Sequence, residues 1–143
     1  MLVGIAHGKK TLPNLTAKYA DGLNVTSNSL EERRTIITAA KNSSDRLGRK
    51  DLIIYWQGFI LIGRTQSELE DCATETARRR GMSETDFRKT SERGNPIDTA
   101  DECVERLRQF TAIGVNSLAL ILTGDTDTTL LESFRDTVIP ELR

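Results

Sequence analysis

The residues with the most evident chemical capacity lie near the start of the chain, where an apolar stretch meets two glycines, a histidine and two lysines. Residues 4–10 read GIAHGKK. Between a parallel strand and a helix, free backbone N–H groups and the helix dipole favour an anion such as a phosphate. Gly8 would let the backbone approach that anion closely, and Lys9 and Lys10 would add positive charge. The pattern matches neither a Walker A loop nor GxGxxG, so a plain strand-to-helix connection with solvated lysines remains the alternative interpretation.

His7, in the same segment, is the only histidine of the chain. A contact to a cofactor or substrate and an ordinary loop histidine with one hydrogen bond both fit this position. We expect no metal site, because partner ligands at metal-binding spacing are missing. No Ser-His-Asp or Cys-His arrangement and no nucleophile elbow is found in the sequence. The catalytic residues are therefore unknown at this level.

Polar residues also occur in or after the next apolar segments. Asn24 would lie near the carboxyl end of its strand, where barrel enzymes hold their ligands. Gln57 interrupts the longest apolar run, and because a buried amide needs partners, it either lines a ligand pocket or is a satisfied core residue. Arg64 follows the same run, and a salt bridge to the acidic helix after it is a simpler interpretation than an anion contact. Arg33 and Arg34 are expected on a solvated helix face.

Continuous apolar runs predict the strands that position these residues. The first run is typical of a strand that is covered on both faces. The predicted strands are 1–6, 23–25, 51–63 and 115–123. A polar segment at 83–93 predicts a short helical insertion.

Apolar periodicity and capping signals predict the helices between the strands. They cover 9–20, 30–47, 65–80, 99–113 and 128–139. Capping boxes open at Ser29, Thr65 and Thr99, and glycine stops follow at Gly48, Gly81 and Gly114. In the last helix, Asp127 is the expected cap and Pro140 the expected end.

The alternation of strands and helices predicts an α/β fold with parallel strands and right-handed crossovers. Such units could form a small doubly wound domain or half of an eight-unit barrel. A length of 143 residues favours a single domain that spans residues 1–143.

Composition excludes several classes of function. With 20 basic and 21 acidic residues, the net charge of −1 provides no long-range attraction to nucleic acid or an anionic membrane. No apolar run approaches the ~20 residues of a membrane span, and the first residues lack the pattern of a signal peptide. Cys72 and Cys103 are too widely spaced for a zinc motif. We expect free thiols in a reducing cytoplasm.

Four stretches together resemble luciferase-like monooxygenases and their deazaflavin-dependent oxidoreductase relatives. In chain order they are LVGIAHGKKTLPNLTAKYADGLNV, IGRTQSELED, TADECVERLRQFTAIGVNSLALIL and VIPELR. The resemblance implies a (β/α)8 barrel that binds FMN or a deazaflavin at the carboxyl ends of its strands. This chain matches only units five to eight. The implied fold is therefore a parallel (β/α)4 half of a TIM-type barrel, with the insertion at 83–93.

The resemblance also implies which residues contact the cofactor. The glycine-rich turn of the family lies against the phosphate-bearing tail, and its counterparts here are Gly4, Ala6, His7, Gly8 and Lys9. Asn24 would stand in the loop after the next strand. Three departures from the family pattern concern these segments: Ile5, Ala6 and His7 break the run of glycines, Leu23 replaces a tryptophan, and Ala100 replaces a proline before the last barrel helix.

The resemblance implies an oxidoreductase or monooxygenase half-barrel in which FMN or a deazaflavin supplies the redox chemistry on a small-molecule substrate. Activity of this chain alone is left open, because the family's first four strands supply much of the ring pocket. The alternative is a non-catalytic scaffold or interaction module without a cofactor. An isolated half-barrel leaves two strand edges and an apolar sheet face uncovered. We therefore expect a homodimer or a complementary N-terminal half-barrel as the partner.

Overall fold

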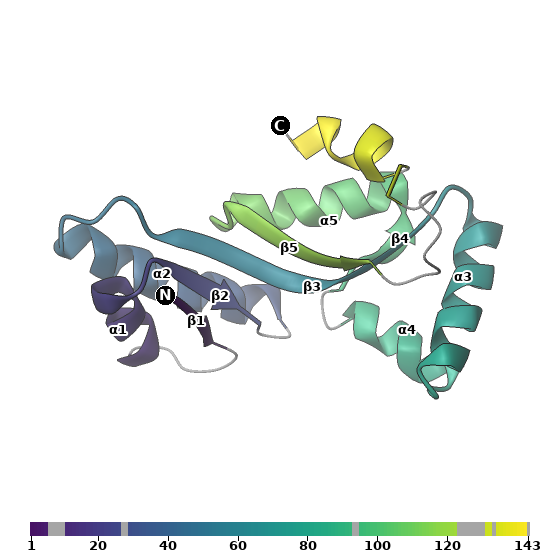
Figure 1. Cartoon of the computed structure of the whole chain (residues 1–143), viewed down its shortest axis with the longest axis horizontal. Coiled ribbons are helices and arrows are strands. Elements are labelled where there is room, and N and C mark those ends of the chain that lie inside the picture. The colour runs from purple at the N-terminus through teal and green to yellow at the C-terminus, as the bar shows by residue number, and fades with distance from the viewer. Residues whose placement is uncertain (6–10, 27–28, 93–94, 123–130, 133, 143) are drawn as a thin grey trace. The chain divides into compact units, whose positions relative to one another are not determined.

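The computed structural model describes residues 1–5, 11–26, 29–92, 95–122, 131–132 and 134–142 (Figure 1). The helices and strands are β1 (Leu2–Ile5), α1 (Thr11–Tyr19), β2 (Gly22–Val25), α2 (Leu30–Arg46), β3 (Ile53–Gly63), α3 (Gln66–Arg79), α4 (Glu84–Glu92), β4 (Ile97–Thr99), α5 (Ala100–Ala112) and β5 (Ser117–Leu122).

The chain divides into two compact units, each of which contains part of β3 and is described here by itself. Unit 1 comprises Met1–Gly58 and Phe110–Ala119. Unit 2 comprises Phe59–Gln109 and Leu120–Arg143.

The strands form one five-stranded sheet, and the predicted parallel α/β fold is confirmed. β1 pairs with β2, β2 with β3 and β3 with β4, each in parallel, and β5 also pairs with β3. The register places Gly4 opposite Asn24, and Asn24 opposite Tyr55. Directly paired residues of parallel strands share a face of the sheet, so these three residues lie on the same face.

In unit 1, one face of the sheet is buried and the other is largely open. The buried face consists of apolar side chains that are at most 1% exposed, namely Ile5, Leu23, Val25, Ile54 and Trp56. On the opposite face, Leu2 is 53% and Ile53 is 39% exposed. The prediction that the first strand is covered on both faces is therefore wrong. Right-handed crossovers of the same sense place α1 and α2 on one side of these strands only.

The predicted capping signals set the ends of the helices. Ser29 and Thr65 each accept a hydrogen bond from the backbone N–H three residues later, at 3.1 and 3.2 Å. At the third box, the hydroxyl and the N–H of Thr99 both donate to the carboxylate of Glu102. The three predicted stops have the left-handed backbone that favours glycine, with φ of 70°, 65° and 103° at Gly48, Gly81 and Gly114.

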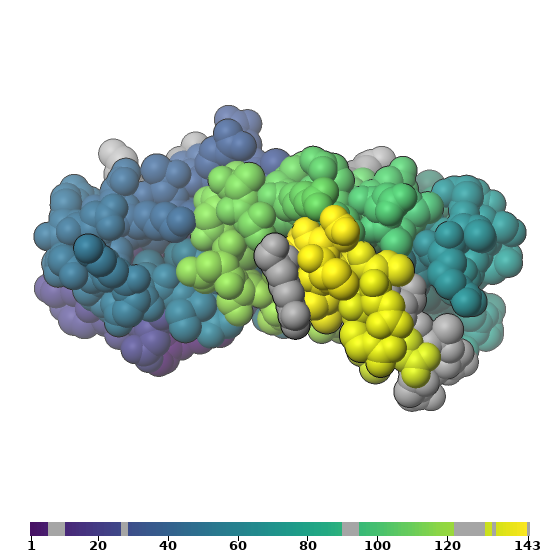
Figure 2. All heavy atoms as spheres, turned by 90° about the horizontal axis from the view of Figure 1, so that it is seen from above, coloured from purple at the N-terminus to yellow at the C-terminus, as the bar shows by residue number. Residues whose placement is uncertain are grey.

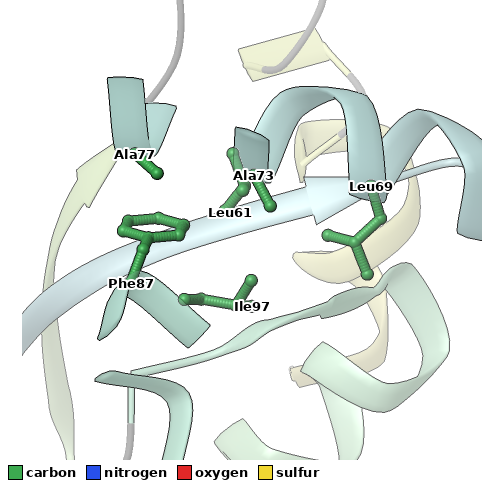
Figure 3. Close-up of a cluster of buried hydrophobic side chains, with 6 residues drawn as sticks. All are labelled: Leu61, Leu69, Ala73, Ala77, Phe87 and Ile97. Atoms are coloured by element: carbon green, nitrogen blue, oxygen red, sulfur yellow. The ribbon is translucent and has the colours of Figure 1, made fainter. Parts of the chain in front are cut away.

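Unit 2 has its own buried apolar cluster, which joins β3, α3, α4 and β4. Figure 3 shows its six side chains: Leu61, Leu69, Ala73, Ala77, Phe87 and Ile97. The helical insertion predicted at 83–93 is confirmed as α4, and its Phe87 is fully buried in this cluster. One buried aromatic residue thus anchors an otherwise polar helix. The three-residue strand β4 was not predicted, because so short a run carries no periodicity.

The end of the chain differs from the predicted last helix. Asp127 lies outside the described residues, and residues 134–138 form a π-helical turn rather than an α-helix. Pro140 begins a 3₁₀ turn instead of ending a helix, as suits a residue with a fixed φ and no N–H. Figure 2 shows this segment in yellow beside α5, where Arg108 Nη2 lies 2.8 Å from a carboxylate oxygen of Glu141.

No helix in the described ranges combines the length and the apolar character needed to cross a membrane.

Candidate functional site

The candidate site lies on the open face of unit 1, at the carboxyl ends of β1 and β2 and the adjacent part of β3. Gly4 and Asn24 are register partners on this face. Gln57 is two residues beyond Tyr55, the partner of Asn24, so it projects from the same face. In parallel α/β folds, this end of the strands is where ligands bind.

Asn24 provides the most informative polar contact of the site. Its Nδ2 donates a hydrogen bond of 2.9 Å to Oε1 of Gln57. Its Oδ1 is buried and has no hydrogen-bond partner among the described residues. Leaving a buried acceptor unpaired costs about 1–3 kcal/mol. Such a group indicates either a local cost of folding or a position that a ligand completes.

Glycines divide this face into a filled part and an open part. A Cβ added at Gly22 would lie 2.8 Å from the ring of Tyr55 and 2.9 Å from Leu2, so these two side chains close over Gly22. A Cβ added at Gly4 would meet no described atom within 4 Å. The open part is therefore at Gly4, next to the amide of Asn24.

Only some of the predicted cofactor residues are among those that the structure describes. Gly4 and Asn24 are brought together as neighbours, but Ala6, His7, Gly8 and Lys9 lie outside the described residues. The prediction that Asn24 stands in the loop after its strand is wrong. It is the third residue of β2, where pairing with both β1 and β3 fixes its position.

Gln57 and Arg64 resolve two alternatives that the sequence left open. Gln57 is exposed and hydrogen-bonded to Asn24, so it belongs to the open face and not to the core. Arg64 forms the expected salt bridge, with Nη2 3.0 Å from the carboxylate of Glu68. Hydrogen bonding from the Arg64 guanidinium lowers the pKa of Glu68. Arg64 is thus paired with a residue of α3, the helix that follows it.

Arg33 corrects another expectation, because it is only 3% exposed instead of lying on a solvated face. Its guanidinium lies 5.6 Å from the ring centre of Trp56 and 4.9 Å from that of Phe110. Burial lowers the pKa of Arg33 to about 10. Stacking on two aromatic rings supports a buried guanidinium. Trp56 precedes Gln57, so this packing also holds the strand that carries the site.

Within the described ranges, no three histidine, cysteine or carboxylate side chains gather as they would around a metal ion. Cys72 is half-buried, Cys103 is buried, and both are free thiols. The chemical groups of the candidate site are therefore amides, a phenol and open backbone. Such groups bind and orient a ligand, whereas redox chemistry requires a cofactor.

Comparison with known proteins supports the fold. No protein-family model and no curated protein matches the sequence. Among solved structures, the monooxygenase RslO1 from Streptomyces bottropensis aligns with a TM-score of 0.75 over 99% of this chain, at 17% identity. The EDTA monooxygenase EmoA from Chelativorans sp. BNC1 aligns with a TM-score of 0.69 over 91% of the chain, at 16% identity.

A third similar structure is the coenzyme F420-dependent tetrahydromethanopterin reductase from Methanopyrus kandleri, with a TM-score of 0.67 over 99% of this chain and 13% identity. The chain spans 48%, 41% and 50% of the lengths of these three proteins, respectively. At these identities the comparison establishes a shared fold. The predicted likeness to luciferase-like monooxygenases and deazaflavin-dependent oxidoreductases is confirmed at that level.

Proposed function

We propose that the open face at Gly4, Asn24 and Gln57 contacts a flavin or deazaflavin, as part of an oxidoreductase or monooxygenase that acts on a small molecule. The observation that carries this proposal is the buried Oδ1 of Asn24, which has no hydrogen-bond partner among the described residues, on the strand next to Gly4. An N–H group of a ligand that binds on this face would supply the missing hydrogen bond.

The similar structures add support from their own cofactors and activities. RslO1 and EmoA are monooxygenases, and the Methanopyrus protein depends on F420, which is a deazaflavin. The open face also lies at the carboxyl ends of parallel strands, where barrel folds bind ligands. A ring system on this face would lie flat against Gly4, whose missing side chain leaves the backbone accessible.

Each residue of the chain would have a limited role. Gly4 would admit the ring, Asn24 would accept a hydrogen bond from it, and Gln57 would hold the Asn24 amide in place through the observed 2.9 Å contact. We also propose that the segment from Ala6 to Lys9 contacts the phosphate end of the cofactor. A bound flavin or deazaflavin supplies hydride or oxygen chemistry, while these residues bind it, orient it and limit the access of water.

Titration of the purified chain with FMN, and separately with F420, tests the proposal. Binding is expected to quench the emission of the cofactor and to shift its visible absorbance, in a saturable manner. A chain that leaves both spectra unchanged at every cofactor concentration would instead be a scaffold without a cofactor, and the proposal would fail.

Replacing the unpaired amide makes the test specific. Asn24→Leu removes the buried unpaired oxygen, which offsets the loss of the hydrogen bond to Gln57, so the variant should fold about as stably as the parent. Loss of one hydrogen bond should nevertheless weaken cofactor binding about tenfold, or ~1.4 kcal/mol. Asn42→Leu, on the exposed surface of α2, is the matched control and should bind like the parent. Equal affinity of the Asn24 variant and the parent would contradict the assignment of the site.

Gly4→Val provides an independent variant. A Cβ at this position meets no described atom within 4 Å, so the thermal stability should change little. The new side chain would occupy the space assigned to the ring and should abolish binding. Unchanged binding would show that the ring lies elsewhere.

The compartment belongs to the proposal as well. Both thiols are free, which suits a reducing cytoplasm, where disulfides do not persist. Fractionation of cells that express the chain should recover it with cytoplasmic markers. Recovery outside the cytoplasm would contradict this part of the proposal.

A further inference from the structure

Helix α1 carries an apolar stripe that faces solvent. Leu12 and Leu15 are each 47% exposed, and Tyr19 is 62% exposed. Spacings of three and four residues place them on one side of the helix. A helix normally packs its apolar stripe against a neighbour, and this stripe has no cover among the described residues.

The stripe lies on the flank of α1 that points away from α2. The buried side of α1 comprises Pro13, Thr16 and Ala17. On one flank of that side, Asn14 lines a groove shared with residues of α2, among them Thr38 and Asn42. At 100° per residue, Leu12, Leu15 and Tyr19 lie on the other flank. A helix that packs on the stripe would therefore continue the helical layer on the side of α1 away from α2.

Strand β1 is open on the corresponding side. Among the described strands it pairs only with β2, so its other edge presents unpaired backbone N–H and C=O groups. Leu2 of this strand is 53% exposed. We name the free edge of β1 together with Leu12, Leu15 and Tyr19 the β1–α1 surface. It has the composition of a place where a further strand and helix pack.

We infer that the β1–α1 surface docks a second copy of this chain. The solved structures with this fold are about twice as long, since the chain covers 41–50% of them, so a partner of equal size suffices to complete the sheet. A second copy brings its own free edge, because β5 pairs only with β3 in the described sheet. In a dimer with a twofold axis, the β1 edge of each copy can pair with the β5 edge of the other copy.

Charge and surface chemistry favour this occupant. Each copy has a net charge of −1, so two copies do not repel each other appreciably. The side chains of the stripe are apolar apart from the hydroxyl of Tyr19, whose ring lies 5.0 Å from the Lys18 ammonium. Burying Leu12 and Leu15 removes apolar area from water, and pairing the β1 edge satisfies its backbone groups. The inference does not depend on cofactor binding.

Sedimentation equilibrium of the full chain over the micromolar range tests the inference. The expected species is a dimer, at twice the 15.9 kDa mass of one chain. A single-chain mass throughout this range, or open-ended association into larger species, would overturn it.

Charge substitutions locate the contact. The double variant Leu12→Glu/Leu15→Glu places carboxylates on the stripe and should raise the dimer dissociation constant at least about tenfold. Leu47→Glu is the matched control, because Leu47 is similarly exposed, at 48%, but follows α2 outside the β1–α1 surface. Far-ultraviolet circular dichroism confirms that each variant is folded. A stripe variant that dimerises like the parent would overturn the assignment of the surface.

Two further measurements separate other outcomes. A chain that stays monomeric and associates only with an added N-terminal half of RslO1 would identify a different occupant and overturn the inference. Hydrogen exchange of the β1 amides should slow as the protein concentration rises, and exchange independent of concentration would contradict docking at this edge. FMN titration of the monomeric variant tests the proposed function separately.

Discussion

Two polar side chains of unit 1 show how position in the sheet decides what a residue does. Arg33 reaches the helix-covered face, where its guanidinium lies over the rings of Trp56 and Phe110 and serves packing. Asn24 projects from the open face, where its amide nitrogen is hydrogen-bonded to Gln57 and its oxygen has no partner among the described residues. The first arrangement is complete within the chain, and the second has capacity for a ligand. The proposed ligand site therefore centres on Asn24.

Thiol reactivity provides a prediction at the residue scale. Burial raises the pKa of Cys103 to about 12, and burial together with Glu68 and Asp71 raises the pKa of Cys72. At pH 8, a thiol with a pKa near 12 is a thiolate in roughly one molecule in ten thousand. Ellman's reagent should therefore label Cys72 slowly in the native protein, and Cys103 only after unfolding in urea.

The variants Cys72→Ser and Cys103→Ser assign the two phases of this labelling. A thiol with a raised pKa is mostly protonated at pH 8. Raising the pH increases its thiolate fraction and should therefore accelerate labelling of the native protein. Two rapidly reacting thiols in the native chain at pH 8 would contradict the burial described for Cys103.

At the scale of elements, the junction between β3 and α3 depends on a glycine. A Cβ at Gly63 would lie 2.6 Å from the backbone nitrogen of Leu69 and 2.7 Å from its Cα. Backbone atoms in a helix cannot move aside as a flexible side chain can. The close approach brings Leu69 into the cluster with Leu61 and Phe87 (Figure 3).

Gly63→Ala should consequently lower the free energy of unfolding by about 2 kcal/mol, in the range of overpacked cores. Urea denaturation measures this change. Gly4→Ala is the control, because its new methyl group meets no described atom within 4 Å, and it should leave the urea midpoint nearly unchanged. Equal midpoints for the two variants would refute the close approach at Gly63.

Sequence patterns predicted the helices and strands better than they predicted any other feature of the structure. Local signals such as the cap at Ser29 and the stop at Gly48 act through neighbouring residues, so they can be recognised from the sequence without knowledge of the tertiary structure. Strand register is not local. The pairing of Asn24 with Gln57 depends on how β2 aligns with β3, and burial of Arg33 depends on the rings that surround it. Neither is encoded in spacing along the chain.

For the whole molecule, alternation of strands and helices predicted the parallel sheet, and the solved structures confirm the fold. The open face was anticipated from the likeness to half of a barrel and is evident at Leu2 and Ile53. The apolar stripe of α1 was not anticipated, because its spacing alone does not tell a buried side from an exposed one. The stripe and the free edge of β1 motivate the proposed second copy, and sedimentation tests it.

We propose above all that the open face at the carboxyl ends of the strands holds a flavin or deazaflavin. ¹⁵N NMR of the labelled chain during titration with FMN, and separately with F420, tests this site residue by residue. With the cofactor that binds, the amide signals of Gly4, Asn24 and Gln57 should shift, and those of Thr38 and Asn42 on the outer surface of α2 should not. Shifts confined to α2, or no shifts at saturating concentrations of either cofactor, would contradict this proposal.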